Sequence, residues 1–225
     1  MYKIYFTELN EDIDKSVFSK LSLFVSTEKQ HRIKDMNFLI DQKLTIYPEV
    51  LVRALACRLY EVKNDGLSFT QNAHGKPQLV EFSQFHFNIS HTRNAMAVAI
   101  AEKAIGIDIE RIKEADFNIA RRFFTEQEQA YIFFDKAHKD IERQRRFYEI
   151  WTQKEAYIKY IGKGLSIPLK SFDVTEISMR DRTCCIEKEE YIISICSKDA
   201  ICRKNVIIAE LSESGLLELA FSVLN

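Results

Sequence analysis

The sequence contains little glycine, proline or cysteine. Six glycines and three prolines among 225 residues argue against a linker-rich, collagen-like or disordered chain. The five cysteines are odd in number and form no C-x-x-C pair, so we expect reduced thiols and neither a disulfide framework nor a zinc site. No apolar run approaches the roughly 20 residues that cross a bilayer, and the N-terminus lacks the apolar segment of a signal peptide. We therefore expect a cytoplasmic protein without a membrane partner.

Net charge is also almost absent. The 32 Lys and Arg residues balance 33 Asp and Glu residues, which gives a formal charge of −1 at pH 7. Proteins that bind nucleic acid non-specifically need a basic surplus, so we expect no nucleic-acid partner. Apolar material is plentiful, because 46% of the residues are hydrophobic and 12% are aromatic. We expect a folded monomer with a sizeable core.

The hydrophobic pattern alternates between helical and strand-like stretches. Helices are predicted within 11–36 and at 49–60, 118–138 and 142–161, and strands at 2–9, 67–69, 86–89, 95–101, 104–110, 172–177, 191–196, 206–211 and 217–224. A helix followed by several strands thus occurs twice. This order favours an α+β protein with two halves, 1–103 and 104–225, joined near 102–105. One continuous α+β domain is the alternative.

The pentapeptide from Gly106 to Glu110 places two acids on a predicted strand. Because side chains alternate along a strand, Ile107 and Ile109 point into a core while Asp108 and Glu110 share the opposite face. Two neighbouring carboxylates repel each other unless a cation lies between them, and hard oxygen ligands suit Mg²⁺. The alternative is a solvent-facing strand edge with two ordinary acids.

Two further features carry charge or polar groups. On the helix around Trp151, Glu155 and Lys159 lie four residues apart. They suit a surface ion pair, or else Glu155 supplies a third carboxylate and Lys159 contacts a phosphate. In the turn that follows strand 86–89, Ser90 offers a hydroxyl and His91 a switchable donor. Each feature alone is also typical of an ordinary solvated surface.

Taken together, these residues resemble the Sfp-type 4′-phosphopantetheinyl transferases. The matching strings occur in the order and at the approximate spacing of that family: Gly75-Lys76-Pro77, Phe87-Asn88-Ile89-Ser90-His91, Gly106-Ile107-Asp108-Ile109-Glu110, Arg122-Phe123-Phe124, Trp151 with Lys154, Glu155 and Lys159, and Gly162-Lys163-Gly164-Leu165. The resemblance implies two pseudo-symmetric α+β halves with the active site between them. It also implies transfer of phosphopantetheine from coenzyme A to a serine of an acyl or peptidyl carrier protein, which leaves adenosine 3′,5′-bisphosphate.

The resemblance also assigns roles to individual residues. A metal ion, Mg²⁺ or alternatively Mn²⁺, is expected on Asp108, Glu110 and Glu155, and catalysis is expected from Asp108, Glu155 and Lys159. Glu155 is expected to bind the metal, to take the proton of the serine, or both. Contacts to coenzyme A are expected from Lys29, Arg32, Lys43, Lys76, Ser90, His91 and Lys159. Where the family usually has a histidine followed by an arginine for the 3′-phosphate, this chain has Lys43-Leu44, and lysine lacks the guanidinium fork.

Two alternative functions remain open from the residues, together with one expected surface. The same acids suit another Mg²⁺-dependent phosphoryl or nucleotidyl transferase, or a non-catalytic module that binds coenzyme A. Residues 136–146 hold five Lys and Arg and two acids, a local charge of about +3. We expect an acidic carrier protein to dock there, although a solvated helix end is the alternative.

Overall fold

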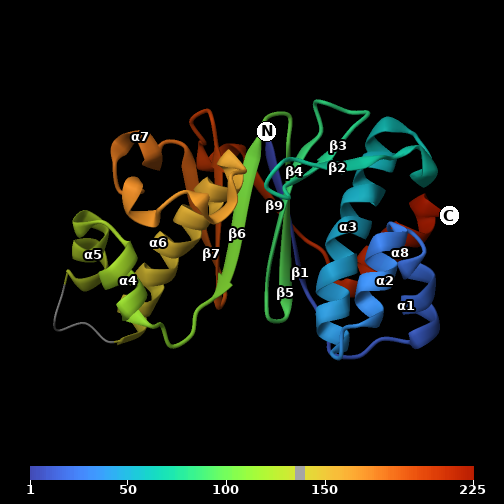
Figure 1. Cartoon of the computed structure of the whole chain (residues 1–225), viewed down its shortest axis with the longest axis horizontal. Coiled ribbons are helices and arrows are strands. Elements are labelled where there is room, and N and C mark those ends of the chain that lie inside the picture. Colours follow the sequence, from blue (N-terminus) through green and yellow to red (C-terminus); the bar gives the residue numbers. More distant parts are fainter. Residues whose placement is uncertain (135–139) are drawn as a thin grey trace.

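The computed structural model of the chain describes residues 1–134 and 140–225 (Figure 1). A four-stranded sheet has the strand order β4-β5-β1-β9, and a three-stranded sheet has the order β6-β8-β7. A short hairpin of β2 and β3 stands apart from both sheets. The strands are β1 (Tyr2–Glu8), β2 (Phe69–Gln71), β3 (Pro77–Leu79), β4 (His86–Thr92), β5 (Ala95–Ala101), β6 (Ile105–Arg111), β7 (Thr183–Lys188), β8 (Tyr191–Ser197) and β9 (Val206–Glu210).

Helices lie outside the two sheets. In Figure 1 the strands occupy the middle of the molecule, with one group of helices on each side. One group contains α1 (Lys15–Ser22), α2 (Thr27–Lys34), α3 (Leu39–Tyr60) and α8 (Glu213–Leu224). The other contains α4 (Phe117–Phe123), α5 (Glu126–Phe133), α6 (Asp140–Ile161) and α7 (Ile177–Arg180). The expected α+β class in two parts, with small and mainly antiparallel sheets, is confirmed. None of the described helices combines the length and apolar character of a membrane span.

The alternation along β6 has the predicted consequence. Ile105, Ile107 and Ile109 are buried in an apolar cluster with residues of β1, β5 and β8. Their neighbours at positions 106, 108 and 110 lie on the opposite face of the strand, because successive side chains point to opposite faces. The cluster therefore fixes which face of β6 carries the acids.

The end of the chain departs from the predicted division into 1–103 and 104–225. Strand β9 pairs in parallel with β1, from Tyr2 opposite Val206 to Phe6 opposite Glu210. Helix α8 then packs against α3 beside the N-terminal helices. Residues 206–225 thus lie with the first half of the structure, although they follow the second half in sequence.

Two element predictions were wrong, and one strand was missed. Residues 217–224 belong to helix α8, in which Ser212 caps the N-terminus and Leu216, Ala220 and Leu224 form a buried stripe. Residues 172–177 form no strand, since Asp173 instead accepts hydrogen bonds from its neighbour Thr175. Strand β7, which includes two adjacent cysteines, was not predicted.

The predicted helical stretch at 11–36 contains two helices. Ser26 accepts a hydrogen bond from the backbone N–H of Lys29 and caps α2, which begins at Thr27 as its sequence indicates. The helix predicted at 49–60 is the second part of α3, which begins ten residues earlier and contains Pro48. An internal proline usually ends a helix, which explains why the earlier turns were not predicted.

Candidate active site

The site lies where β4 and β6, the outer strands of the two main sheets, face each other. Three polar side chains at alternate positions of β4 point toward β6, as the period of a strand requires. Asn88 Oδ1 accepts a hydrogen bond from the backbone N–H of Ile107 at 2.8 Å, and Ser90 Oγ accepts one from Ile109 at 3.3 Å. Thr92 Oγ1 donates to Glu110 Oε2 at 3.3 Å. Side chains of β4 thereby accept hydrogen bonds from backbone N–H groups at the unpaired edge of β6, the strand that carries the acids.

Gly106 lets helix α6 approach β6 closely. A Cβ atom at this position would overlap the backbone of Ala156 and Tyr160, so no larger residue fits without movement of the helix. The glycine shares its strand face with Asp108 and Glu110. The close packing therefore brings those two acids under the part of α6 that carries Glu155 and Lys159.

Asp108 occupies the centre of the arrangement and is 5% exposed. Its Oδ1 accepts hydrogen bonds from Lys159 Nζ at 2.7 Å and from Ser90 Oγ at 2.9 Å. Its Oδ2 is buried and has no hydrogen-bond partner within the described structure. Burial raises the pKa of this carboxyl, even though the Lys159 charge and both hydrogen bonds act to lower it. One oxygen of Asp108 is thus left without the partner that a buried carboxylate requires.

The negative charge of Asp108 also acts on the other two acids, Glu110 and Glu155. Burial, and after it the negative charge of Asp108, raises the pKa of Glu110 and of Glu155. The charge of Glu110 also raises the pKa of Glu155. The three predicted metal ligands therefore repel one another, and an added cation would relieve that repulsion.

The three carboxylates are not arranged as a complete metal site in this structure. Across residues 1–134 and 140–225, no group of three or more His, Cys, Asp or Glu side chains has the spacing of a metal site. Lys159 instead supplies the positive charge next to Asp108. The donor set still suits a hard divalent cation, because it consists of carboxylate oxygens and includes the unpartnered Oδ2 of Asp108.

A pocket of about 250 Å³ opens beside these residues. Its lining includes Lys76, Glu155 and Lys159, together with the turn at His74 and Gly75. It therefore brings together one acid and two basic residues that the sequence analysis selected, from both halves of the chain.

His91 lies next to this group but faces elsewhere. It is exposed and lines a separate hollow of about 680 Å³ with Asp41 and Arg93, at the end of β4. Its neighbour Ser90 is buried and already engaged, since Lys159 Nζ also donates to Ser90 Oγ at 2.7 Å. Of these two predicted contacts to coenzyme A, only His91 is open to a ligand in this arrangement.

Of the upstream basic residues, Lys43 requires a correction. Its side chain is fully buried, and its ammonium is paired with Glu213 at 2.7 Å. The same ammonium donates to the backbone carbonyls of Asn10 and Asp12, each at 2.7 Å. A lysine with these three acceptors in the interior cannot also reach a phosphate at the surface, so it is not retained as a ligand for coenzyme A.

Lys29 and Arg32 both belong to α2. Lys29 forms an ion pair with Glu49 at 2.8 Å, and its side chain remains partly exposed. Arg32 is exposed. Both are therefore accessible to an anionic ligand, unlike Lys43.

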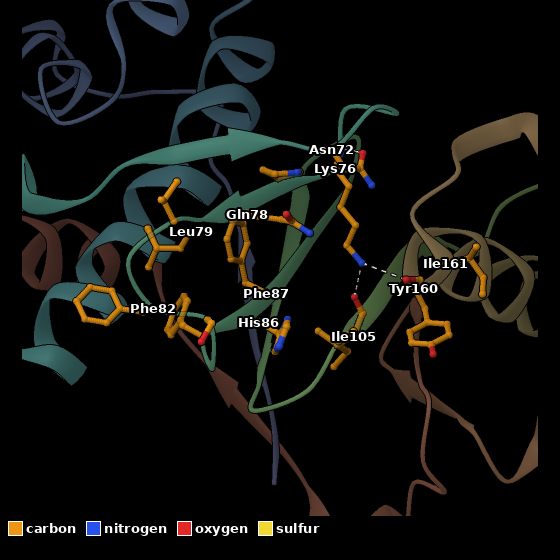
Figure 2. A pocket seen from close by; sticks show the side chains of 15 residues that line it. Asn72, Lys76, Gln78, Leu79, Phe82, His86, Phe87, Ile105, Tyr160 and Ile161 are labelled. Carbon is orange, nitrogen blue, oxygen red and sulfur yellow. Dashed lines mark hydrogen bonds between the residues drawn. The ribbon is translucent and has the colours of Figure 1, made fainter.

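Lys76 turns its ammonium into the interface between the halves. Nζ donates to the backbone carbonyls of Lys159 at 2.7 Å and Ile105 at 2.9 Å, and Figure 2 shows it pointing at this junction. The residue predicted to meet the nucleotide thus contacts the backbone of β6 and α6.

The lysine in the tryptophan motif is structural. Lys154 is fully buried and forms an ion pair with the equally buried Glu128 at 2.7 Å. It also donates to the carbonyls of Leu169 and Phe172. Trp151 packs nearby against Phe124 and Phe147 on the apolar side of α6.

Sequence reasoning missed the roles of several residues at this site. Asn88 and Thr92 were not selected, although they alternate with Ser90 along one strand face. Asn72 was also missed, and its side chain donates to the carbonyl of Gly162 at 2.8 Å. Polar residues recur at every second position from 86 to 92, and this alternation was the signal that could have identified Asn88 and Thr92.

Comparisons with known proteins agree with the geometry. Residues 104–209 match the 4′-phosphopantetheinyl transferase superfamily, and residues 13–103 match the description "4′-phosphopantetheinyl transferase, N-terminal". The chain is 38% identical to 4′-phosphopantetheinyl transferase gsp of Aneurinibacillus migulanus, over 76% of this chain and 70% of that protein. It is 35% identical to 4′-phosphopantetheinyl transferase Sfp of Bacillus subtilis, over 76% of this chain and 75% of that protein.

Proposed function

Because this chain belongs to the 4′-phosphopantetheinyl transferase superfamily, it is an enzyme that transfers phosphopantetheine to carrier proteins, and we propose that the transfer takes place beside Asp108, Glu155 and Lys159. Coenzyme A is the donor of the group, and a serine hydroxyl of the carrier accepts it. The observation that carries this placement is a group of three carboxyls with raised pKa and the ammonium of Lys159, beside a pocket that Glu155 and Lys159 line.

Asp108, Glu110 and Glu155 are the residues that would hold Mg²⁺ or Mn²⁺. The unpartnered Oδ2 of Asp108 supports this proposal, as does the mutual repulsion that raises the three pKa values. When bound, such an ion polarises phosphoryl oxygens and neutralises their developing charge. No order of preference between the two ions follows from a set of oxygen donors.

Glu155 is proposed to accept the proton of the attacking serine. The serine oxygen forms a bond to the pantetheine-side phosphorus of coenzyme A, and the bond from that phosphorus to the bridging oxygen breaks. Adenosine 3′,5′-bisphosphate leaves with the electron pair of that bond. A raised pKa makes Glu155 a better base than an ordinary carboxylate, and it remains largely ionised only above that pKa.

Lys159 is proposed to move from Asp108 toward a phosphoryl oxygen. Its ammonium now donates to Asp108 and Ser90, and its side chain is 29% exposed at the edge of the pocket. A positioned ammonium stabilises the negative charge that grows on the phosphoryl group in the transition state. Ser90 in turn orients both Asp108 and Lys159, which makes it a positioning residue.

Lys29, Arg32 and His91 are proposed to contact the phosphates of coenzyme A. The two residues of α2 and the end of β4 are accessible, and each offers a cationic or switchable donor. Lys43 leaves the set of contacts expected from sequence, because it is buried and paired.

The test is an incubation with coenzyme A, Mg²⁺ and an apo carrier protein, read by intact mass. We expect the carrier to gain one phosphopantetheine, and a carrier with its acceptor serine changed to alanine to gain nothing. A gain of a nucleotidyl group would support a different transferase. Binding of coenzyme A without any gain, across fatty-acid, polyketide and nonribosomal-peptide carriers, would overturn the proposal in favour of a binding module.

A further inference from the structure

Lys76 connects one half of the structure to two elements of the other. It ends the turn before β3, and its ammonium lies among backbone carbonyls of the second half (Figure 2). Nζ lies 2.9 Å from the carbonyl oxygen of Ile105, the first residue of β6. It lies 2.7 Å from that of Lys159 and 3.4 Å from that of Tyr160, near the end of α6. One side chain thus joins the beginning of the acid strand to the end of the helix that carries Glu155.

The turn around Lys76 is built to present this side chain. Asn72 Oδ1 accepts hydrogen bonds from the backbone N–H groups of His74 and Lys76, and Gly75 adopts a φ of 84° that favours glycine. The other end of the Asn72 amide donates to the carbonyl of Gly162 at 2.8 Å. Gly162 itself has a φ of 71° and terminates α6. Two side chains of the turn therefore bind the last carbonyls of α6.

The chemistry of these acceptors explains why a lysine is tolerated there. The last carbonyls of a helix have no partner within the helix and carry partial negative charge. An ammonium satisfies several of them at once, whereas an apolar side chain would leave them buried and unpaired. Burial lowers the pKa of Lys76 to about 8, so the group is still mainly charged at neutral pH.

We infer that Lys76 is a positioning residue for the transfer, which sets the contact between Lys159 and Asp108 by holding the end of α6 against the start of β6. The inference rests on the function proposed above. Lys76 binds the carbonyl of Lys159 itself, and Ile105 lies three positions before Asp108. Gly106 leaves the two backbones in contact between those points. A small displacement of α6 would therefore act directly on the 2.7 Å pair of Lys159 and Asp108.

This role makes a kinetic prediction that a nucleotide contact would not make. In Lys76→Met the chain length is kept and the donors are lost. We expect kcat to fall by about tenfold to a hundredfold, because misplacement of reacting groups by about 1 Å has effects of that size. KM for coenzyme A should stay close to the wild-type value, since the ammonium is already engaged by three backbone carbonyls. A residue that binds the nucleotide would show the opposite division, with a raised KM and a retained kcat.

The experiment compares wild type, Lys76→Met and Lys170→Met in the same transfer assay and in amide hydrogen exchange. Lys170 is exposed and does not line the pocket of Lys76, Glu155 and Lys159, so its variant controls for loss of a lysine. We expect faster exchange at the end of α6 in Lys76→Met alone, together with the loss in kcat. Unchanged kcat and unchanged exchange in a folded Lys76→Met, or a rise confined to KM, would overturn the inference.

Asn72→Ala tests the same junction should Lys76→Met not fold. It removes the bond to Gly162 and the two bonds that the Asn72 side chain accepts within the turn, but it keeps the ammonium, so we expect a smaller loss of kcat with the same increase in exchange. If Asn72→Ala keeps both the activity and the exchange rates of the wild type, the inference is overturned. Absence of transfer by the wild type itself would instead overturn the proposed function, while the exchange result would still report on the junction.

Discussion

Ser90 Oγ donates a hydrogen bond to Asp108 Oδ1 at 2.9 Å, across the boundary between the two sheets. The same Oγ accepts from Lys159 Nζ at 2.7 Å, so one hydroxyl orients both members of the central ion pair. All hydrogen-bonding capacity of the hydroxyl is used in these contacts and in the one from the backbone of Ile109. Ser90 therefore links the strand of one half to the acid and the cation of the other.

Removal of Asp108 should nearly abolish transfer and leave the fold intact. Asp108→Ala takes away the unpartnered Oδ2, the proposed metal ligand, and the acceptor of Lys159. Rates are measured over a series of Mg²⁺ concentrations, and circular dichroism checks the fold. Glu114→Ala, which changes an exposed acid just beyond β6, serves as the matched control. Retained activity with an unchanged dependence on Mg²⁺ would contradict the metal assignment.

Glu155→Gln separates the two roles of this side chain. The variant keeps the size of the residue and removes both the base and most of the affinity for a cation. We expect a loss of kcat that persists at saturating Mg²⁺, together with a flatter ascending limb in the pH profile. Full recovery of kcat at high Mg²⁺ would reduce Glu155 to a metal ligand. Glu218→Gln, an exposed acid on α8, is the control.

The acids should also make stability depend on pH and on the cation. Burial, and after it the charge of Asp108, raises the pKa of Glu155 above its ordinary value of 4.5. A carboxyl with a higher pKa in the folded state binds its proton more tightly there. Its contribution to stability is therefore greatest at acid pH and is lost as pH rises from 4.5 through the raised pKa.

The measurement for this effect is the melting temperature of wild type and Glu155→Gln in EDTA, from acid to neutral pH. The wild type should lose stability relative to the variant as pH rises, and Mg²⁺ should restore it at neutral pH more than at acid pH. A difference in melting temperature between the two proteins that stays constant with pH, both in EDTA and with Mg²⁺, would argue against a site in which the three acids share one cation.

The acid strand was predictable because its evidence is local. Ile105, Ile107 and Ile109 alternate with Gly106 and Asp108, and a period of two fixes the two faces without reference to any other element. The start of α2 was predictable for the same reason, since Ser26 precedes it directly. In both cases neighbouring residues contain the whole signal.

The departures arise from partners distant in sequence. No local feature of 206–210 indicates that this strand pairs with β1 and leaves the sheet of the second half. The segment 217–224 is apolar at six of its eight positions, so its pattern fits a strand or a buried helix. Lys43 stands at a position that a family motif suggests for a phosphate ligand, and its burial depends on Glu213 near the other end of the chain.

The basic run at 136–146 remains a prediction for carrier docking. Lys136 and Lys139 lie outside the described residues. Arg145 forms ion pairs with Glu142, Glu149 and Glu187, and Arg146 with Glu142, so part of the positive charge is already compensated. Charge reversal would place new carboxylates beside these acids, which makes a neutral variant the clearer test.

In Arg145→Gln with Arg146→Gln, we expect KM for the carrier to rise at low salt and KM for coenzyme A to stay constant. The effect should shrink at high salt, because salt screens attraction between exposed charges. Arg58→Gln, on the exposed side of α3, controls for the loss of positive charge. An unchanged KM for the carrier at low salt would place docking on another surface.

Lys43→Met should destabilise the protein without weakening its affinity for coenzyme A. The substitution leaves the carboxylate of Glu213 buried without its cation, although Tyr47 Oη still donates to it at 2.8 Å. Loss of one partner of a buried pair typically costs about 3 kcal/mol in the free energy of unfolding, which urea denaturation can measure. The double variant Lys43→Met with Glu213→Gln removes the uncompensated charge and should recover part of that loss. A large rise in KM for coenzyme A at nearly unchanged stability would show instead that Lys43 reaches a phosphate. That result would contradict the exclusion of Lys43 from the coenzyme A contacts.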